Sequence, residues 1–322
     1  MQRMPNNSRG GNEAASRREW MPYALIGFLA LCLVPVAFAW SLMRSAVALT
    51  LQNETFTYIP LIPVVSAYLI YTERKTIFSS PSYGWMTGGP LTMLGAAGLV
   101  VARFNFFEMR PINQISLLML ALVFIWAGAF AIFFGGRSFR AASFPLLFLL
   151  FAIPIPEPTL SQIILLLQQG SASATAAIFQ MFNVPFVRQD LVFELPGVAI
   201  RIAEECSGIR SSLALLITTV LASHFFLRSG WRKLVLCILV VPIVILKNGL
   251  RIATLSTLAI YVNPGFLYGR LHHQGGVVFF LIALLPMAFV LLLLQKSENK
   301  KIVLPTTART PITAITALKD GE

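Results

Sequence analysis

The feature that most constrains this chain is a series of long, unbroken apolar runs. A helix needs about 20 predominantly apolar residues to cross the hydrocarbon core of a bilayer, and runs near that length recur from residue 23 to residue 295. Only 12% of the residues are charged, whereas about 25% are charged in soluble domains. The sequence therefore predicts an all-α polytopic membrane protein. It excludes a soluble enzyme and a disordered chain. The apolar runs also lack the alternation of apolar and polar residues that the strands of an outer-membrane barrel show.

Eight runs are predicted transmembrane helices. They are residues 23–43, 55–71, 84–102, 112–134, 141–156, 208–227, 231–247 and 276–295. The region 159–182 is also apolar, but it carries Gln162, Gln168 and Gln169, and we expect it to lie along the outer interface. The predicted organisation is one membrane domain at 20–296, between a cytoplasmic tail at 1–19 and a disordered cytoplasmic tail at 297–322.

Short basic clusters between the apolar runs set the predicted orientation, because Lys and Arg are enriched in cytoplasmic loops. These clusters stand at residues 1–19, 73–75, 137–140, 228–233 and 296–301. Placing them in the cytoplasm puts residues 186–207 and 248–275 on the outer side. The basic residues that produce the net charge of +12 are thus interpreted as signals of membrane orientation. No nucleic-acid partner is expected.

The outer segment 186–206 has the pattern of a β-hairpin. Apolar residues alternate with polar ones from Val187 to Leu195 and again from Val198 to Ile202, and Pro196-Gly197 between them marks a turn. The segment is too charged to cross lipid. We therefore expect a small hairpin on the outer face that delivers Cys206 to the start of the next helix.

Cys206 has the setting of a reactive cysteine. A cysteine at a helix N-terminus sees the positive end of the helix dipole, which favours the thiolate, and the N–H groups there can hold an oxyanion. Arg210 adds positive charge, and the supporting candidates are Glu205, Ser207 and Gly208. The alternative is a small buried residue, as expected for Cys32 and Cys237 within apolar runs.

Four further candidate residues lie on the same predicted side of the membrane. Asn248 and Arg251 are three apart and share a helix face, while His272 and His273 precede the last helix. A neutral imidazole can take a thiol proton, and a guanidinium can hold oxyanion charge. The alternatives are an arginine that reaches to the headgroups and structural histidines. No clustered ligand set has zinc spacing, so neither a metal nor another cofactor is expected.

These motifs resemble the exosortase/archaeosortase family. The resemblance rests on the hairpin ending in Glu205-Cys206-Ser207-Gly208-Ile209-Arg210, then Asn248-Gly249-Leu250-Arg251, then His272 four residues before Gly276. It covers residues 187 to 280 and the eight-helix plan. In the N-terminal half, Tyr58-Ile59-Pro60-Leu61-Ile62-Pro63 is similar only in character to an early proline-containing outer segment of that family.

The resemblance implies a cysteine transpeptidase of the bacterial cytoplasmic (inner) membrane, with its site facing outward. It implies Cys206 as nucleophile, Arg251 as oxyanion stabiliser and His272 as general acid/base, with His273 as the alternate. The implied substrates are membrane-anchored exported proteins that end in a short motif such as Pro-Glu-Pro, a transmembrane helix and a basic cluster. The acceptor is expected to be a lipid, a polysaccharide precursor or water.

Other functions stay open at this point. A transporter or channel would place ionisable residues near the middle of the bilayer. A serine-type intramembrane protease would use a Ser-Gly pair such as Ser207-Gly208, and a polysaccharide-export subunit would need only the topology. The internal Pro156-Glu157-Pro158 is interpreted as a stiff turn rather than a sorting signal. The oligomeric state and the choice between hydrolysis and transfer are not predicted.

Overall fold

A computed structural model describes residues 8–79, 82–267 and 270–303, and it describes the backbone alone at 8–21, 205, 264, 267, 270–275 and 300–303. The chain divides into two compact units, 1–162 and 163–322. In the described part, seven helices are long and apolar enough to cross a membrane, or eight if one bent pair counts as a span. This confirms the predicted all-α polytopic class.

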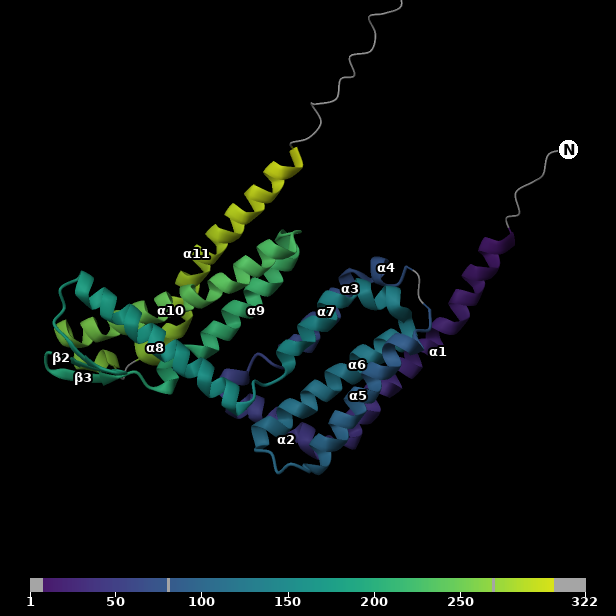
Figure 1. Ribbon diagram of the computed structural model, residues 1–322, viewed down its shortest axis with the longest axis horizontal. Helices are drawn as coiled ribbons and strands as arrows, with labels where there is room; N and C mark the ends of the chain where they lie inside the picture. Colours follow the sequence, from purple (N-terminus) through teal and green to yellow (C-terminus); the bar gives the residue numbers. More distant parts are fainter. Residues whose placement is uncertain (1–7, 80–81, 268–269, 304–322) are drawn as a thin grey trace, which may run out of the picture. The chain divides into compact units, whose positions relative to one another are not determined.

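The first unit consists of helices and short 3₁₀ turns (Figure 1). Its elements are α1 (Ser8–Phe38), α2 (Trp40–Gln52), η1 (Glu54–Phe56), α3 (Leu61–Thr72), α4 (Arg74–Ile77), α5 (Trp85–Phe104), α6 (Pro111–Ala141), α7 (Ser143–Phe148), η2 (Leu149–Ala152) and the start of α8 (Glu157–Met181). Glycines bring α5 and α6 into close contact, because a Cβ at Gly95 would lie 2.7 Å from the carbonyl oxygen of Ala121. Small residues at such contacts are typical of membrane helices.

The first predicted span, 23–43, is not one straight helix. The chain bends by 83° between α1 and α2. Pro35 lies one turn before the bend and cannot donate a backbone hydrogen bond to the helix. The prediction of one transmembrane span over 23–43 therefore holds only if the bent pair α1 and α2 together form one span.

Residues 141–156, predicted as a span, form the short helices α7 and η2 and an extended end, and they do not meet the length of a spanning helix. The following helix α8 does meet it, although the sequence favours an outer-interface position for 159–182. Either assignment gives one crossing between Arg140 and the sheet, so the predicted sides of the later segments are unchanged. The side-on position of α8 stays a prediction.

The second unit contains three long helices that pack side by side and a small sheet (Figure 1). Its elements are the rest of α8, β1 (Val187–Gln189), β2 (Val192–Leu195), β3 (Val198–Arg201), η3 (Glu204–Ser207), α9 (Ile209–Phe226), α10 (Gly230–Tyr261), η4 (Pro264–Leu267) and α11 (Arg270–Val303). The predicted span 231–247 is longer than expected. α10 continues to Tyr261, so Asn248 and Arg251 lie within one helix, as their predicted shared face requires, and the predicted outer connection 248–275 starts only after Tyr261.

The predicted hairpin is present, and it is part of a three-stranded antiparallel sheet. β2 pairs with β3, with Leu195 opposite Val198, and Gly197 adopts a φ of +82° in the turn between them. The predicted single strand over 187–195 is interrupted, because Asp190 adopts a φ of +53°. That turn folds β1 back on β2.

One hydrophobic cluster joins this sheet to two helices, and we call it the hairpin core. It consists of Ala172, Phe179, Val184, Phe193, Leu195, Ile202, Ile252 and Ala253. Phe179 of α8 and Phe193 of β2 meet edge to face, with ring centroids 5.8 Å apart. The hairpin core therefore fixes the strand that leads to Cys206 against both α8 and α10.

A buried ion pair joins the opposite end of this unit. Arg232 of α10 pairs with Glu298 of α11 at 3.0 Å. The same carboxylate accepts the backbone N–H groups of Arg228 and Ser229 at 2.9 Å and 2.7 Å. Glu298 thus holds the α9–α10 connection and α11 in one arrangement.

We expect Glu298→Gln to lower the midpoint of thermal unfolding in detergent. The amide cannot neutralise Arg232, which is 4% exposed, and an uncompensated buried charge is strongly destabilising. The control is Lys296→Gln, which removes an exposed charge from the same helix. Equal midpoints for Glu298→Gln and wild type, measured by tryptophan fluorescence, would contradict this role.

Candidate functional site

Cys206 lies in a tight turn immediately before α9. The turn consists of η3 and Gly208, and α9 begins at Ile209. The Cys206 side chain is a half-buried thiol, it packs against the hairpin core, and its backbone N–H donates to the carbonyl of Ala203 at 3.0 Å. The structure thus places the cysteine at the N-terminal end of a helix, as the sequence predicts.

Gly208 is required in this turn for two reasons. Its φ is +74°, a left-handed conformation that side chains with a Cβ rarely adopt. A Cβ there would also lie 3.0 Å from Asn248 Oδ1 and 3.4 Å from Lys247 Nζ. The glycine therefore allows the turn to approach α10 closely.

Asn248 connects the cysteine turn to two helices. It is 0% exposed, and its Nδ2 group donates to the carbonyl oxygen of Cys206 at 2.7 Å and to Ser171 Oγ of α8 at 3.0 Å. The Asn248 Oδ1 atom has no hydrogen-bond partner among the described residues. One carboxamide thus positions the backbone of the predicted nucleophile.

Lys247, the residue before Asn248, reaches the other side of the same turn. Its ammonium donates to Ser211 Oγ at 2.5 Å, and the Ser211 hydroxyl donates to the carbonyl oxygen of Gly208 at 3.0 Å. Of these consecutive residues of α10, Asn248 therefore binds the turn directly at Cys206, and Lys247 is linked to it at Gly208 through Ser211. No role was predicted for Lys247 from the sequence, although a lysine within an apolar helix is itself a functional signal.

Arg251 lies one helical turn beyond Lys247 and Asn248, and it is half-buried. The two residues after it, Ile252 and Ala253, belong to the hairpin core against which Cys206 packs. The predicted arginine therefore lies on the part of α10 that packs against the hairpin core.

Polar residues of α8 contact the backbone on either side of the cysteine turn, although from the sequence they were interpreted as part of a helix along the outer interface. Gln168 donates to the carbonyl of Ile202 at 2.9 Å. The Thr175 hydroxyl donates to the carbonyl of Ser171 in its own helix at 2.7 Å, and it also lies 3.3 Å from the carbonyl oxygen of Gly249 in α10. With Ser171 they follow a spacing of three and four residues, which places them on one face of a helix. That spacing was the available signal that they contact protein rather than the membrane surface.

The remaining predicted residues differ in what can be said of them. Ser207 is fully buried, and its hydroxyl accepts the N–H of Ile209 at 3.4 Å, whereas Arg210 is exposed in the first turn of α9. The backbones of His272 and His273 lie in the first turn of α11. The side chains of Glu205, His272 and His273 fall outside the described residues, so their predicted roles stay predictions.

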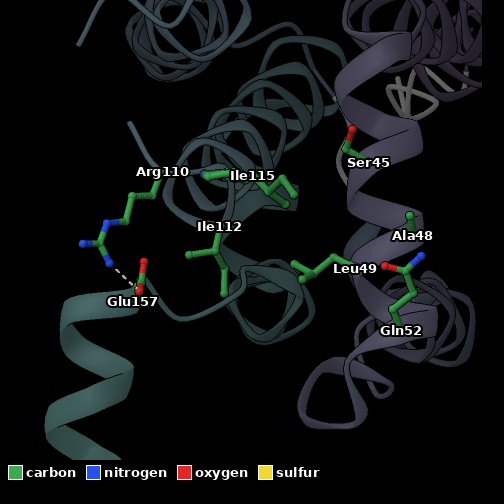
Figure 2. A pocket seen from close by; sticks show the side chains of 9 residues that line it. Ser45, Ala48, Leu49, Gln52, Arg110, Ile112, Ile115 and Glu157 are labelled. Carbon is green, nitrogen blue, oxygen red and sulfur yellow. Dashed lines mark hydrogen bonds and ion pairs between the residues drawn. The ribbon is translucent and has the colours of Figure 1, made fainter. Parts of the chain in front are cut away.

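No three His, Cys, Asp or Glu side chains gather in a position to hold a metal ion among the residues described. The first unit contains a separate cavity of about 560 Å³, lined by α2, the start of α6 and the start of α8. Figure 2 shows Arg110 and Glu157 facing each other at its rim, 2.6 Å apart, with Ile112 and Ile115 beside them. None of the predicted site residues lines this cavity.

The arrangement around Cys206 suits a nucleophilic thiol. Backbone N–H groups at the N-terminus of a helix point back toward the preceding turn, where they stabilise negative charge. Lys247 adds a cation on the α10 side of the turn, and Arg251 follows it four residues later on the same helix. A thiolate, or the oxyanion formed when a thiolate attacks a carbonyl, is the kind of group that such surroundings favour.

We expect Asn248→Asp to disorder the cysteine turn, because a carboxylate cannot donate to the Cys206 carbonyl or to Ser171. An unsatisfied buried group costs about 1–3 kcal/mol, and here two acceptors lose their donor. The measurement is the midpoint of thermal unfolding, together with the rate of protease cleavage after residue 201. Asn263→Asp is the matched control, because Asn263 uses only its Oδ1 acceptor, toward the N–H of Gly265. Equal effects of the two substitutions would contradict the role of Asn248.

A family model described as transmembrane exosortase matches residues 50–289, which is most of the chain and includes the cysteine turn, α10 and the start of α11. Searches of curated proteins and of solved structures found no match.

Proposed function

The chain belongs to the transmembrane exosortase family, and from this membership and the surroundings of Cys206 we propose that it is a cysteine-type sorting transpeptidase. Its proposed substrates are exported proteins held in the membrane by a C-terminal sorting signal. The observation that carries the proposal is the arrangement of the cysteine turn. Asn248 donates a hydrogen bond to the Cys206 carbonyl, and the turn lies between the N-terminus of α9 and the ammonium of Lys247 on α10.

In the proposed reaction, His272 takes the proton of the Cys206 thiol, with His273 as the alternate. The thiolate attacks the scissile carbonyl carbon of the substrate. Negative charge then forms on the carbonyl oxygen, where Arg251 and the N–H groups at the start of α9 stabilise it. The C–N bond breaks, and the leaving amine receives the proton from the imidazole.

The acylated Cys206 is a thioester, and its second half-reaction releases the enzyme. An amine or hydroxyl of an acceptor, or water, attacks the thioester carbonyl, and the thiol is restored. A lipid or a polysaccharide precursor at the outer face is the proposed acceptor. Ser207, Gly208, Arg210 and Glu205 are proposed to support the site rather than to react.

Two features support a site at the outer face of the bacterial cytoplasmic membrane. The basic residues Arg232 and Lys233 lie at the start of α10, on the predicted cytoplasmic side. About 20 residues of helix, or about 30 Å, separate them from Arg251, which matches the thickness of the hydrocarbon core. The substrate helix is therefore proposed to lie in the bilayer, with its motif at the outer boundary beside Cys206.

We expect Cys206→Ala and Cys206→Ser to abolish processing of a co-expressed substrate while leaving membrane insertion intact. The measurement is the size of the substrate on an immunoblot, followed by trapping of the wild-type thioester and the mass of the attached peptide. Cys32→Ala and Cys237→Ala are matched controls that should process normally. Normal processing by Cys206→Ala would end the proposal and favour a serine-type protease or a non-enzymatic function.

Arg251→Lys is expected to reduce the processing rate by about 100-fold or more, because an ammonium keeps the charge but loses the planar fork that holds an oxyanion. The measurement is the initial rate of substrate processing in membranes with equal amounts of each protein. Lys233→Arg, a change between the same residue types on the same helix, is the control. A rate near that of the wild type would show that Arg251 serves only as a membrane anchor.

A further inference from the structure

Lys247 is a buried cation inside an apolar helix. It is 6% exposed, and it lies between Leu246 and Asn248 in α10, which has the length and composition of a membrane span. Burying an ammonium costs free energy unless a partner compensates it. A lysine retained at such a position therefore needs an explanation.

The contacts of Lys247 do not neutralise its charge. Its hydrogen-bond partner is the hydroxyl of Ser211, and no carboxylate of the described residues pairs with it. Arg251 is four residues further along the helix, where two like charges repel each other. By contrast, the buried Arg232 of the same helix pairs directly with the Glu298 carboxylate.

The ammonium faces the cysteine turn. Its Nζ atom is 3.4 Å from the position that a Cβ on Gly208 would take, and Gly208 is two residues from Cys206. Through Ser211, the same ammonium is linked to the Gly208 carbonyl. Lys247 thus lies beside the segment that carries the thiol and adds positive charge where the N-terminus of α9 already supplies it.

We propose that Lys247 is a further positioning residue of this site, whose charge favours the thiolate form of Cys206 and whose contact with Ser211 holds the turn against α10. This inference rests on the proposed role of Cys206 as the nucleophile. The anion that compensates the buried lysine is then the one that the reaction creates, first on sulfur and afterwards on the carbonyl oxygen of the substrate.

Several other charged groups surround the turn. Arg251 lies on α10, Arg210 is exposed on α9, Glu204 is exposed on η3, and Arg201 is exposed at the end of β3. The α8 residues packed against the turn carry no ionisable side chain. Lys247 is therefore the most buried of the described cations near the thiol. Its removal should affect the ionisation of the Cys206 thiol more than the removal of an exposed cation would.

The test measures the ionisation of the thiol without any substrate. In full-length protein carrying Cys32→Ala and Cys237→Ala, Cys206 is the sole thiol, and its rate of alkylation by iodoacetamide is followed from about pH 5.5 to about pH 10. Lys247→Gln keeps a hydrogen-bond donor but removes the charge, and Lys247→Met is a second uncharged variant suited to an apolar helix. We expect both to raise the midpoint of the profile by about one pH unit.

Two controls keep this result specific. Lys247→Arg keeps the charge and should leave the midpoint in place. Lys233→Gln removes a lysine about 21 Å away along the same helix and should not change it. A profile of either uncharged Lys247 variant that coincides with the wild type, or an equal shift for Lys233→Gln, would overturn the role of Lys247.

The same variants separate this inference from the proposed function. If Lys247→Gln is slow in substrate processing near pH 7 and regains much of its rate near pH 9, the charge acts through the thiol as proposed. If the alkylation profile does not shift while Cys206→Ala abolishes processing, the transpeptidase proposal stands and the role of Lys247 falls. Normal processing by Cys206→Ala would instead remove the proposed function, whatever the profile shows.

Discussion

The carboxamide of Asn248 is the interaction on which the rest of the site depends. Its Nδ2 group binds the Cys206 carbonyl and Ser171 Oγ at the same time, so three segments far apart in the sequence meet at one buried group. Hydrogen bonds that are shielded from water are costly to leave unmade. The position of the thiol is therefore determined by α8 and α10 as much as by the turn that contains it. Gly208 allows this contact, because any larger residue would push the turn away from Asn248.

The two buried cations of α10 have different surroundings. At the start of the helix, Arg232 is buried against Glu298, and the carboxylate also accepts two backbone N–H groups. Near the middle, Lys247 has a neutral hydroxyl as its hydrogen-bond partner, and Arg251 lies one turn away. The first arrangement is complete in the resting protein, which suits a structural role. The second places a cation beside the proposed nucleophile, which suits a site where negative charge develops only during reaction.

Much of this fold is visible in the sequence, because lipid requires long apolar helices and the turn at Pro196-Gly197 has a clear signal. The cysteine at a helix start and the shared face of Asn248 and Arg251 could also be predicted. The extra turn at Asp190 could not, since it arises from a local backbone angle that several residue types adopt. The break in the first span follows Pro35, but a proline within an apolar run does not fix the size of the bend. Lys247, Gln168, Ser171 and Thr175 did carry a signal in their type and spacing, but their partners depend on which helix faces which, and hydropathy along one segment carries no such information. The roles of His272 and His273 stay predictions.

The hairpin core has a consequence for synthesis of the protein. The sheet is translated before Ile252 and Ala253, yet it packs against them, and the donor to the Cys206 carbonyl is also encoded later. At about 5–20 residues per second, the ribosome needs on the order of seconds to pass from the cysteine to the end of α10. During that interval the strands lack the α10 part of the hairpin core, and the Cys206 carbonyl lacks its hydrogen-bond donor. The cysteine turn therefore reaches its final arrangement only after α10 has been made.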